Sequence, residues 1–321
     1  MRGAAPWVRN PSSLLHLGFV LFAPLKPALK IAVGTLLIYT IVWAGSFHFH
    51  DELERPLLLA VNHSSTVPGL NALMILITDF SVPYVAVLLS LWGLGAEAVE
   101  RGWVRTKTLE IAFPAVGSAI ALWLSIWLVP TYTEWTAPLA TSVLAVVGLG
   151  WAGRSYRHFP AETLGRLRRA FWLSGLSILI AEACIELLVW HTPFRPRPFA
   201  HENALWNSAL LAVPDEYVRH GNSYVSGHAA ALFALLTPFV WAARRTSVKV
   251  LLLAWATVHA LSRVYVAAHF PYCVLMGSFL GASVATLLVW ATVGVNPRAR
   301  WVAAAHPPYG EGERGSVGAE S

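Results

Sequence analysis

The chain is organised around two stretches, Ser-Tyr-Val-Ser-Gly-His at residues 223–228 and Ser-Arg-Val-Tyr-Val-Ala-Ala-His at residues 262–269. A third basic element, Arg-Pro-Arg-Pro at residues 195–198, lies upstream of both. Together they combine guanidinium groups, which can fork onto phosphoryl oxygens, with a Ser-Gly turn that opens a helix and with two imidazoles. This combination predicts phosphoryl transfer through a phosphohistidine.

The composition is that of an integral membrane protein. Of 321 residues, 56% are hydrophobic and only 12% are charged, and the mean hydropathy is +0.56. So many apolar side chains cannot be placed in one soluble core. A net charge of +6 would suggest nucleic acid as the partner of a soluble protein. Here most basic residues lie in short gaps between apolar runs, so we expect a lipid bilayer as the partner and no nucleic acid.

The apolar runs predict an all-α polytopic protein with about eight transmembrane helices. We expect an interfacial lead-in at 14–30 and short surface helices across 51–79. The free thiols Cys184 and Cys273 lie in or beside apolar segments. The predicted division is an N-terminal interfacial and transmembrane region at 1–109, a membrane domain at 110–294 and a disordered cytoplasmic tail at 295–321. The predicted spans are 31–47, 83–95, 111–129, 137–151, 170–190, 228–243, 250–268 and 274–293.

The distribution of basic residues predicts the orientation of these spans. With the N-terminus inside, most of the 23 Lys and Arg residues fall in inside segments, as the positive-inside rule requires. All three motif segments then lie on the extracytoplasmic side of the cell membrane. A lipid phosphate presents its headgroup at this level while its tail stays in hydrocarbon.

The motifs resemble those of the type 2 phosphatidic acid phosphatases, whose pattern is K-x6-RP, PSGH and SR-x5-H-x3-D. The resemblance covers residues 190–288 and implies a six-helix phosphatase-type core in the C-terminal two thirds of the chain. It implies that His269 is the nucleophile and His228 the general acid, with neither metal nor another cofactor. The phosphate ligands that it implies are Arg197, Ser226, Gly227 and Arg263.

Three positions depart from this pattern. Trp190 replaces the lysine, Val225 the proline of PSGH, and Cys273 the aspartate that orients the nucleophile. A thiol is a weak hydrogen-bonding group and is uncharged at its ordinary pKa. Two functions therefore stay open: a membrane phosphatase or phosphotransferase acting on a lipid phosphate or polyprenyl diphosphate, and a weak or inactive protein that binds or transports lipid phosphates.

Several other polar residues are accessory candidates. If helical spacing continued through Pro271, the Cys273 thiol would face the imidazole of His269 from the next turn. Intramembrane carboxylates are functional candidates. Glu182 and Glu186 either pair with Arg195 or Arg263, replace the missing aspartate, or bond to a neighbouring helix, and Asp79 is a similar candidate.

Two further alternatives concern the histidines. A zinc site could use His228, His269 and Cys273, but the neighbouring arginines would repel the cation. Polar residues of the loop between the first two motifs either shape a headgroup pocket or are simply solvated. They are His191, His201, Asp215, Glu216 and His220.

Overall fold

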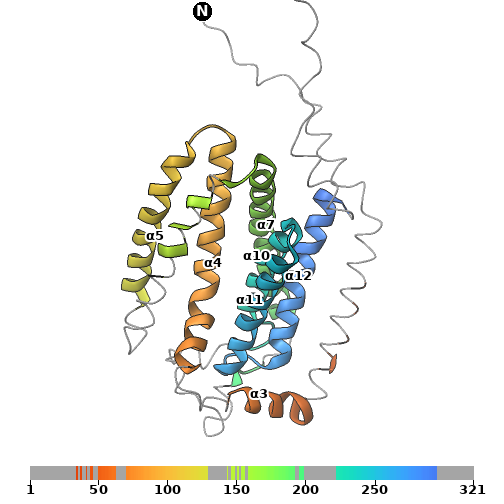
Figure 1. Cartoon of the computed structure of the whole chain (residues 1–321). Coiled ribbons are helices and arrows are strands. Elements are labelled where there is room, and N and C mark those ends of the chain that lie inside the picture. Colours follow the sequence, from red (N-terminus) through yellow and green to blue (C-terminus); the bar gives the residue numbers. More distant parts are fainter. Residues whose placement is uncertain are drawn as a thin grey trace, which may run out of the picture.

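The computed structural model is built from helices (Figure 1). The residues that it describes are 34, 37, 41, 44, 45, 50–62, 70–128, 143, 146–148, 150, 151, 153–155, 158–191, 195–198 and 222–294. Their elements are the π-helix η2 (His50–Glu54), α3 (Arg55–Asn62), α4 (Leu70–Glu100), α5 (Thr106–Leu128), α7 (Ala161–His191), α10 (Gly227–Ala242), α11 (Thr246–Tyr265) and α12 (Pro271–Val293). This part of the chain contains no strand, only an isolated bridge between Pro196 and Asn222. The prediction of an all-α protein is confirmed.

Helix α10 occupies the centre of the bundle, where it packs against α7, α11 and α12 (Figure 1). It is apolar on every side and most of its residues are buried, which is typical of a core helix. The helix begins after Ser226, whose hydroxyl accepts a hydrogen bond of 3.4 Å from the backbone N–H of Ala229. The central helix of the bundle therefore starts within the second motif.

Two glycines of α12 allow its backbone to touch that of α10. A Cβ on Gly277 would lie 2.3 Å from the carbonyl oxygen of Ser226, and one on Gly281 would lie 2.1 Å from that of Ala230. Small residues four positions apart are a common means of close helix packing in membranes. This crossing fixes the first turn of α10 against α12.

The described helices have the length and surface of a membrane protein. Three are long and apolar enough to cross a membrane, at Ala161–Val189, Thr246–Tyr265 and Pro271–Val293, and two shorter apolar stretches accompany them, Val85–Val99 within α4 and Gly227–Ala242. Large apolar side chains point outward, including Leu179, which is 70% exposed, and Leu251, which is 68% exposed. Such a surface is suited to lipid, and the protein is a polytopic membrane protein.

The N-terminal half differs from the prediction. The sequence predicts short surface helices across 51–79 and a short span at 83–95, but α4 runs from Leu70 to Glu100 without interruption. Pro83 lies inside this helix, because neighbouring helices and local adjustments can compensate for its missing N–H in a membrane. The predicted spans at 31–47 and 137–151 fall largely outside the described residues, as does the predicted tail at 295–321.

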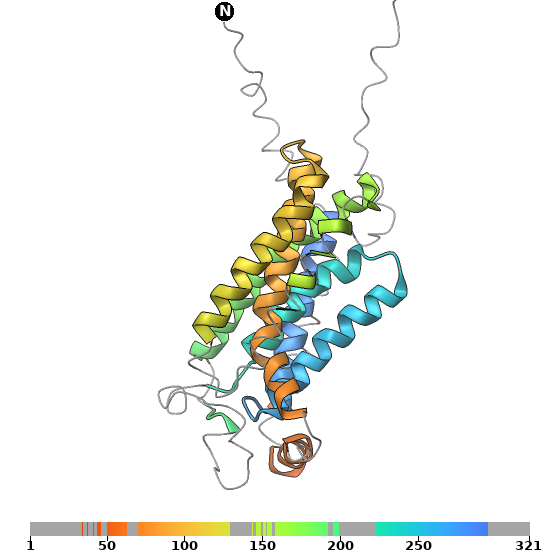
Figure 2. The same ribbon diagram turned by 60° about the vertical axis from the view of Figure 1, so that its left-hand side comes forward.

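The two ends of the bundle differ in composition. The three motif segments lie at one end, and α3 lies across that end (Figures 1 and 2). At the other end, α4 and α5 meet in a short turn and α7 begins. The described basic residues of that end include Arg101, Arg105, Lys107, Arg154, Arg166, Arg168, Arg169, Arg244, Arg245 and Lys249.

Candidate functional site

The start of α10 has the geometry of an anion site. The N–H of Ser226 donates to the carbonyl of Cys273 at 3.0 Å, and the Ser226 hydroxyl caps the helix. The next two residues are Gly227, which is partly exposed, and His228, which is exposed. N–H groups in the first turn of a helix have no partner within the helix. Gly227 and His228 are therefore the positions whose N–H groups can face a phosphate, while Ser226 holds the turn in place.

The residue before Ser226 has an unusual backbone. Val225 has a φ of 56°, in the left-handed region that β-branched residues seldom adopt. The proline expected here from the resemblance would fix φ near −65° and could not adopt this conformation. The substitution of proline by Val225 is therefore linked to a different shape of the loop.

His269 lies in the turn between α11 and α12, with its imidazole buried to 2% exposure. Its Nδ1 is 3.0 Å from the carbonyl oxygen of Ser223. Because a carbonyl can only accept a hydrogen bond, Nδ1 carries the proton and Nε2 carries the lone pair. Burial lowers the pKa of His269 well below its usual value of 6.5, and the positive charges of Arg197 and Arg263 lower this pKa further.

Arg197 and Arg263 approach the two histidines from different segments. Arg263 is in the last turn of α11, is 5% exposed, and donates from Nη1 to the Thr78 hydroxyl at 3.4 Å. Arg197 follows α7 in the chain and is partly exposed. The charges of both guanidinium groups act on His228 and on His269. The fold thus brings together the two arginines and the two histidines that the sequence singles out.

A carboxylate that the sequence reasoning missed is built into the same end of the bundle. Glu54 of η2 is 1% exposed, forms an ion pair with Arg195, and accepts a hydrogen bond of 3.1 Å from the N–H of Tyr272. The guanidinium carbon of Arg195 also lies 4.3 Å from the centre of the Phe270 ring. Arg195 is therefore held by Glu54 rather than by Glu182 or Glu186 of the predicted pairings.

Cys273 does not face His269 from a following helical turn, so this expectation is wrong. Helix α11 ends at Tyr265, Ala267 has a φ of 55°, and a new helix begins at Pro271. The Cys273 sulfur instead receives hydrogen bonds from Arg195 Nη1 at 3.5 Å and from the Ser223 hydroxyl at 3.6 Å. The thiol thus connects the Glu54 ion pair to the segment that orients His269.

Helix α4 packs against α11 and forms hydrogen bonds with the residues that surround Arg263. The Ser262 hydroxyl lies 2.9 Å from that of Thr78 and 2.7 Å from the carbonyl oxygen of His259. His259 is fully buried, with Nδ1 3.0 Å from the carbonyl oxygen of Ile77, and its ring stacks on that of His228 at 6.4 Å. The sequence reasoning missed Thr78 and His259. His259 could have been identified as a candidate because it is an ionisable residue within an apolar helix.

Of the remaining candidates, the structure describes the side chains of Glu182 and Glu186 only. The Glu182 carboxylate lies near the start of α10, with Oε2 4.0 Å from where a Cβ on Gly227 would be, and Glu186 is exposed on α7. Trp190 and His191 are in the last turn of α7 and Asp79 is in α4, but their side chains lie outside the described residues. The polar loop residues His201, Asp215, Glu216 and His220 also lie outside them. Within the described residues, no group of three or more His, Cys, Asp or Glu side chains is placed to hold a metal ion.

A bundle of apolar helices that gathers two histidines and two arginines at a helix N-terminus defines a membrane protein with a site suited to a phosphoryl group. Residues 170–296 match the model of the PAP2 superfamily, so this region is similar to the membrane domain of that superfamily. Members of the superfamily are phosphatases, and the match supports a fold of the membrane lipid phosphatase type for this region. No curated protein and no solved structure matches the chain.

Proposed function

We propose that the protein is a lipid phosphatase that hydrolyses a lipid phosphate or polyprenyl diphosphate through a phosphohistidine on His269. The observation that carries the proposal is the hydrogen bond between His269 Nδ1 and the Ser223 carbonyl. This bond leaves the lone pair on Nε2, as a nucleophile requires, and the lowered pKa of His269 keeps the ring neutral. A backbone carbonyl thus sets the tautomer, which in other catalytic sites is a task of a carboxylate.

The roles of the surrounding groups follow from their charge and position. Arg197 and Arg263 neutralise the phosphoryl oxygens, and the first N–H groups of α10 add hydrogen bonds to them. The charges of Arg263 and Arg197 by themselves disfavour a proton on His228, and the negative charge of a bound phosphate offsets them. As the bond from His269 Nε2 to phosphorus forms and the bond to the lipid oxygen breaks, protonated His228 gives its proton to that oxygen. Deprotonated His228 then accepts a proton from water, which attacks phosphorus and releases inorganic phosphate and neutral His269.

We place the site on the extracytoplasmic side of the cell membrane. The concentration of basic residues at the opposite end of the bundle supports this orientation, because cytoplasmic segments carry the excess of Lys and Arg. The site would then lie at the level of the lipid headgroups of the outer leaflet. An impermeant thiol reagent should therefore label a cysteine introduced at Asn222 in intact cells but not one introduced at Arg166.

A second candidate is a protein that binds or transports lipid phosphates without turnover. Two observations favour it: His269 is only 2% exposed, and the uncharged Cys273 stands where the family pattern has a carboxylate. In this case the arginines would hold the phosphate while the nucleophile stays covered. Binding of a lipid phosphate without release of phosphate would identify this function.

The deciding experiment measures phosphate release by purified protein from a phosphatidic acid and from a polyprenyl diphosphate, with and without EDTA. We expect His269→Ala to abolish release and His228→Ala to slow it by about 10² to 10⁴. His158→Ala serves as the control, because His158 is exposed and precedes α7 at the other end of the bundle. A phosphoenzyme that is stable to base and labile to acid should form in the wild type and be absent from His269→Ala. Release that survives His269→Ala, or that disappears with EDTA, would overturn the mechanism.

A further inference from the structure

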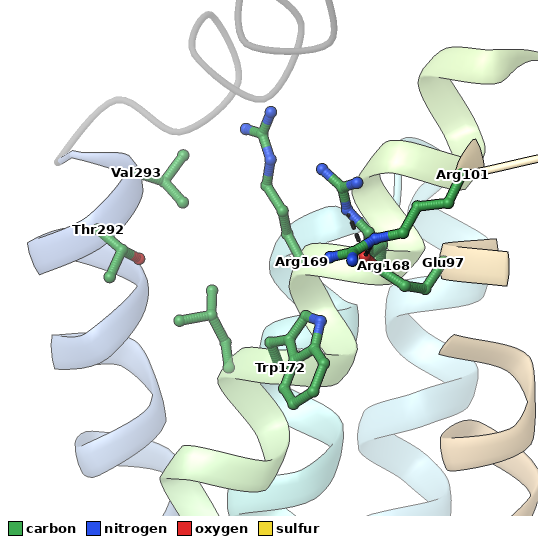
Figure 3. Close-up of a pocket in the computed structure, with 8 residues that line it drawn as sticks. Glu97, Arg101, Arg168, Arg169, Trp172, Thr292 and Val293 are labelled. Carbon is green, nitrogen blue, oxygen red and sulfur yellow. Dashed lines mark ion pairs between the residues drawn. The ribbon is translucent and has the colours of Figure 1, made fainter. Parts of the chain in front are cut away.

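A groove of about 520 Å³ lies at the end of the bundle opposite the phosphate site. Its walls come from the end of α4, the first part of α7 and the end of α12 (Figure 3). We call it the arginine groove, after Arg101, Arg168 and Arg169. None of these residues belongs to the phosphate site.

The arginine groove has an excess of positive charge. Its lining contains three arginines and one acid, Glu97, so that three positive charges and one negative charge give +2. Glu97 is 6% exposed and forms ion pairs with Arg101 and Arg168. The distance from Arg168 Nε to Glu97 Oε2 is 3.4 Å. Figure 3 shows the Arg169 side chain between this ion-pair group and the end of α12. One carboxylate thus holds two guanidinium groups, and the lining contains more basic than acidic side chains.

The groove becomes apolar deeper in the bundle. Trp172 follows Arg168 by one helical turn, about 6 Å along α7. Its side chain is 59% exposed, whereas the neighbouring Leu173 is 8% exposed and packs into the bundle. Tryptophan is enriched at the headgroup level of membranes, because its ring is apolar and its N–H is polar. Guanidinium groups, an indole and aliphatic side chains thus follow one another along the groove. This order is complementary to a lipid with an anionic headgroup followed by an acyl chain.

We propose that the arginine groove binds the anionic headgroup of a membrane lipid. The phosphate would lie among the guanidinium groups of Arg168 and Arg169, which can each donate two parallel hydrogen bonds to it. The first part of the acyl chain would lie over Trp172. Basic pockets between transmembrane helices are known to hold such headgroups. The proposal requires a bundle that spans the membrane and is independent of any catalysis at the phosphate site.

A purely structural explanation of the same residues makes a different prediction. Arginines near the ends of α4 and α12 can pair with Glu97 and with the negative ends of the helix dipoles. In that case the protein would not distinguish anionic from zwitterionic lipids. The two explanations therefore differ in lipid selectivity.

The test is native mass spectrometry of the full-length protein in neutral detergent, titrated with phosphatidylglycerol, with phosphatidylcholine of the same chain length, and with inorganic phosphate. We expect phosphatidylglycerol to bind more tightly than both other probes. The double variant Arg168→Gln, Arg169→Gln should weaken its binding by about tenfold or more. Arg245→Gln, an exposed change at the same end, and Arg263→Gln in the phosphate site should leave that binding unchanged.

Several results would overturn the proposal. They are equal affinity for phosphatidylcholine, an affinity of the Arg263→Gln protein for inorganic phosphate as high as for phosphatidylglycerol, and phosphatidylglycerol binding that the double variant leaves intact or that Arg263→Gln removes. If the double variant does not fold, the exposed change Trp172→Ala replaces it. Trp172→Ala should weaken the binding of phosphatidylglycerol and leave that of inorganic phosphate unchanged, and an unchanged lipid affinity would again overturn the proposal.

Discussion

The role of the ion pair between Glu54 and Arg195 can be tested with two substitutions, one that removes the buried carboxylate and one that introduces a carboxylate at another position beside Arg195. Glu54→Gln removes the charge that faces Arg195, and Cys273→Asp places a new carboxylate where the thiol sulfur now lies 3.5 Å from Arg195 Nη1. Each single change unbalances the charges, because it either removes the carboxylate that faces Arg195 or adds a second one. The double variant restores one carboxylate beside one guanidinium group.

The expected magnitudes follow from burial. The Glu54 side chain is 0% exposed and that of Arg195 is 10% exposed, so Glu54→Gln leaves a charge that water hardly reaches. Removing one partner of such a pair costs about 3–5 kcal/mol of folding free energy. The amide of glutamine can still accept from the N–H of Tyr272, so we expect the lower part of this range. The double variant should be destabilised by about 1–3 kcal/mol less than the sum of the two single effects, the usual coupling between contacting residues.

The assay combines unfolding of the purified protein in mixed micelles, followed by tryptophan fluorescence, with the rate of phosphate release. The control is Glu52→Gln, because Glu52 is exposed only two residues away. We expect phosphate release to fall in both single variants and to recover in the double variant, since Ser223 and His269 are positioned through this network. A Glu54→Gln protein as stable as the control, or strictly additive effects in the double variant, would refute this reasoning.

Three further predictions concern packing, protonation and backbone shape. Gly281→Ala should destabilise the protein by about 1–3 kcal/mol in the same unfolding assay, because the new Cβ would lie 2.1 Å from the Ala230 carbonyl oxygen. Gly175→Ala should not destabilise the protein, because a Cβ there would have nothing within 4 Å. The free energy of unfolding should fall as the pH drops below about 6.5, because the imidazole of His269 then takes up a proton in the unfolded chain but not in the folded protein. The fall should be at most about 1.4 kcal/mol per pH unit and should end at the lowered pKa of folded His269. His269→Gln should remove this part of the pH dependence, and an identical slope in both proteins would contradict the assignment. Val225→Pro should cost about 1–3 kcal/mol and lower phosphate release, since proline cannot adopt a φ of 56°, whereas Val225→Asn should keep the loop.

Much of the fold was predictable because its signals are local. Long apolar runs predict helices in a membrane, and the helices that carry the motifs begin and end near the predicted positions. The end of α11 was not predictable in this way, because the turn at Ala267 lies within an apolar run. The uninterrupted α4 was also missed, since Pro83 and the polar residues before it suggest breaks in an isolated helix.

The candidate site was predictable where a motif carries it. The sequence singled out both histidines and both arginines, and the structure brings them together. Glu54 could not be found in this way, because one of several acids in the segment 51–54 becomes buried only when this segment meets Arg195 and Tyr272. The Ser223 carbonyl was equally hidden, since a backbone oxygen leaves no trace in the residue sequence.

The hydrogen bond from Ser226 to the Cys273 carbonyl and that from Tyr272 to Glu54 join the first turns of α10 and α12 to the N-terminal part of the chain. Because the ribosome makes these parts at different times, a nascent chain that ends at residue 270 already contains both histidines but lacks the partners that shape their surroundings. These partners become available only when α12 has been made and has joined the bundle. We therefore expect a chain that ends before α12 to lack the proposed phosphatase activity.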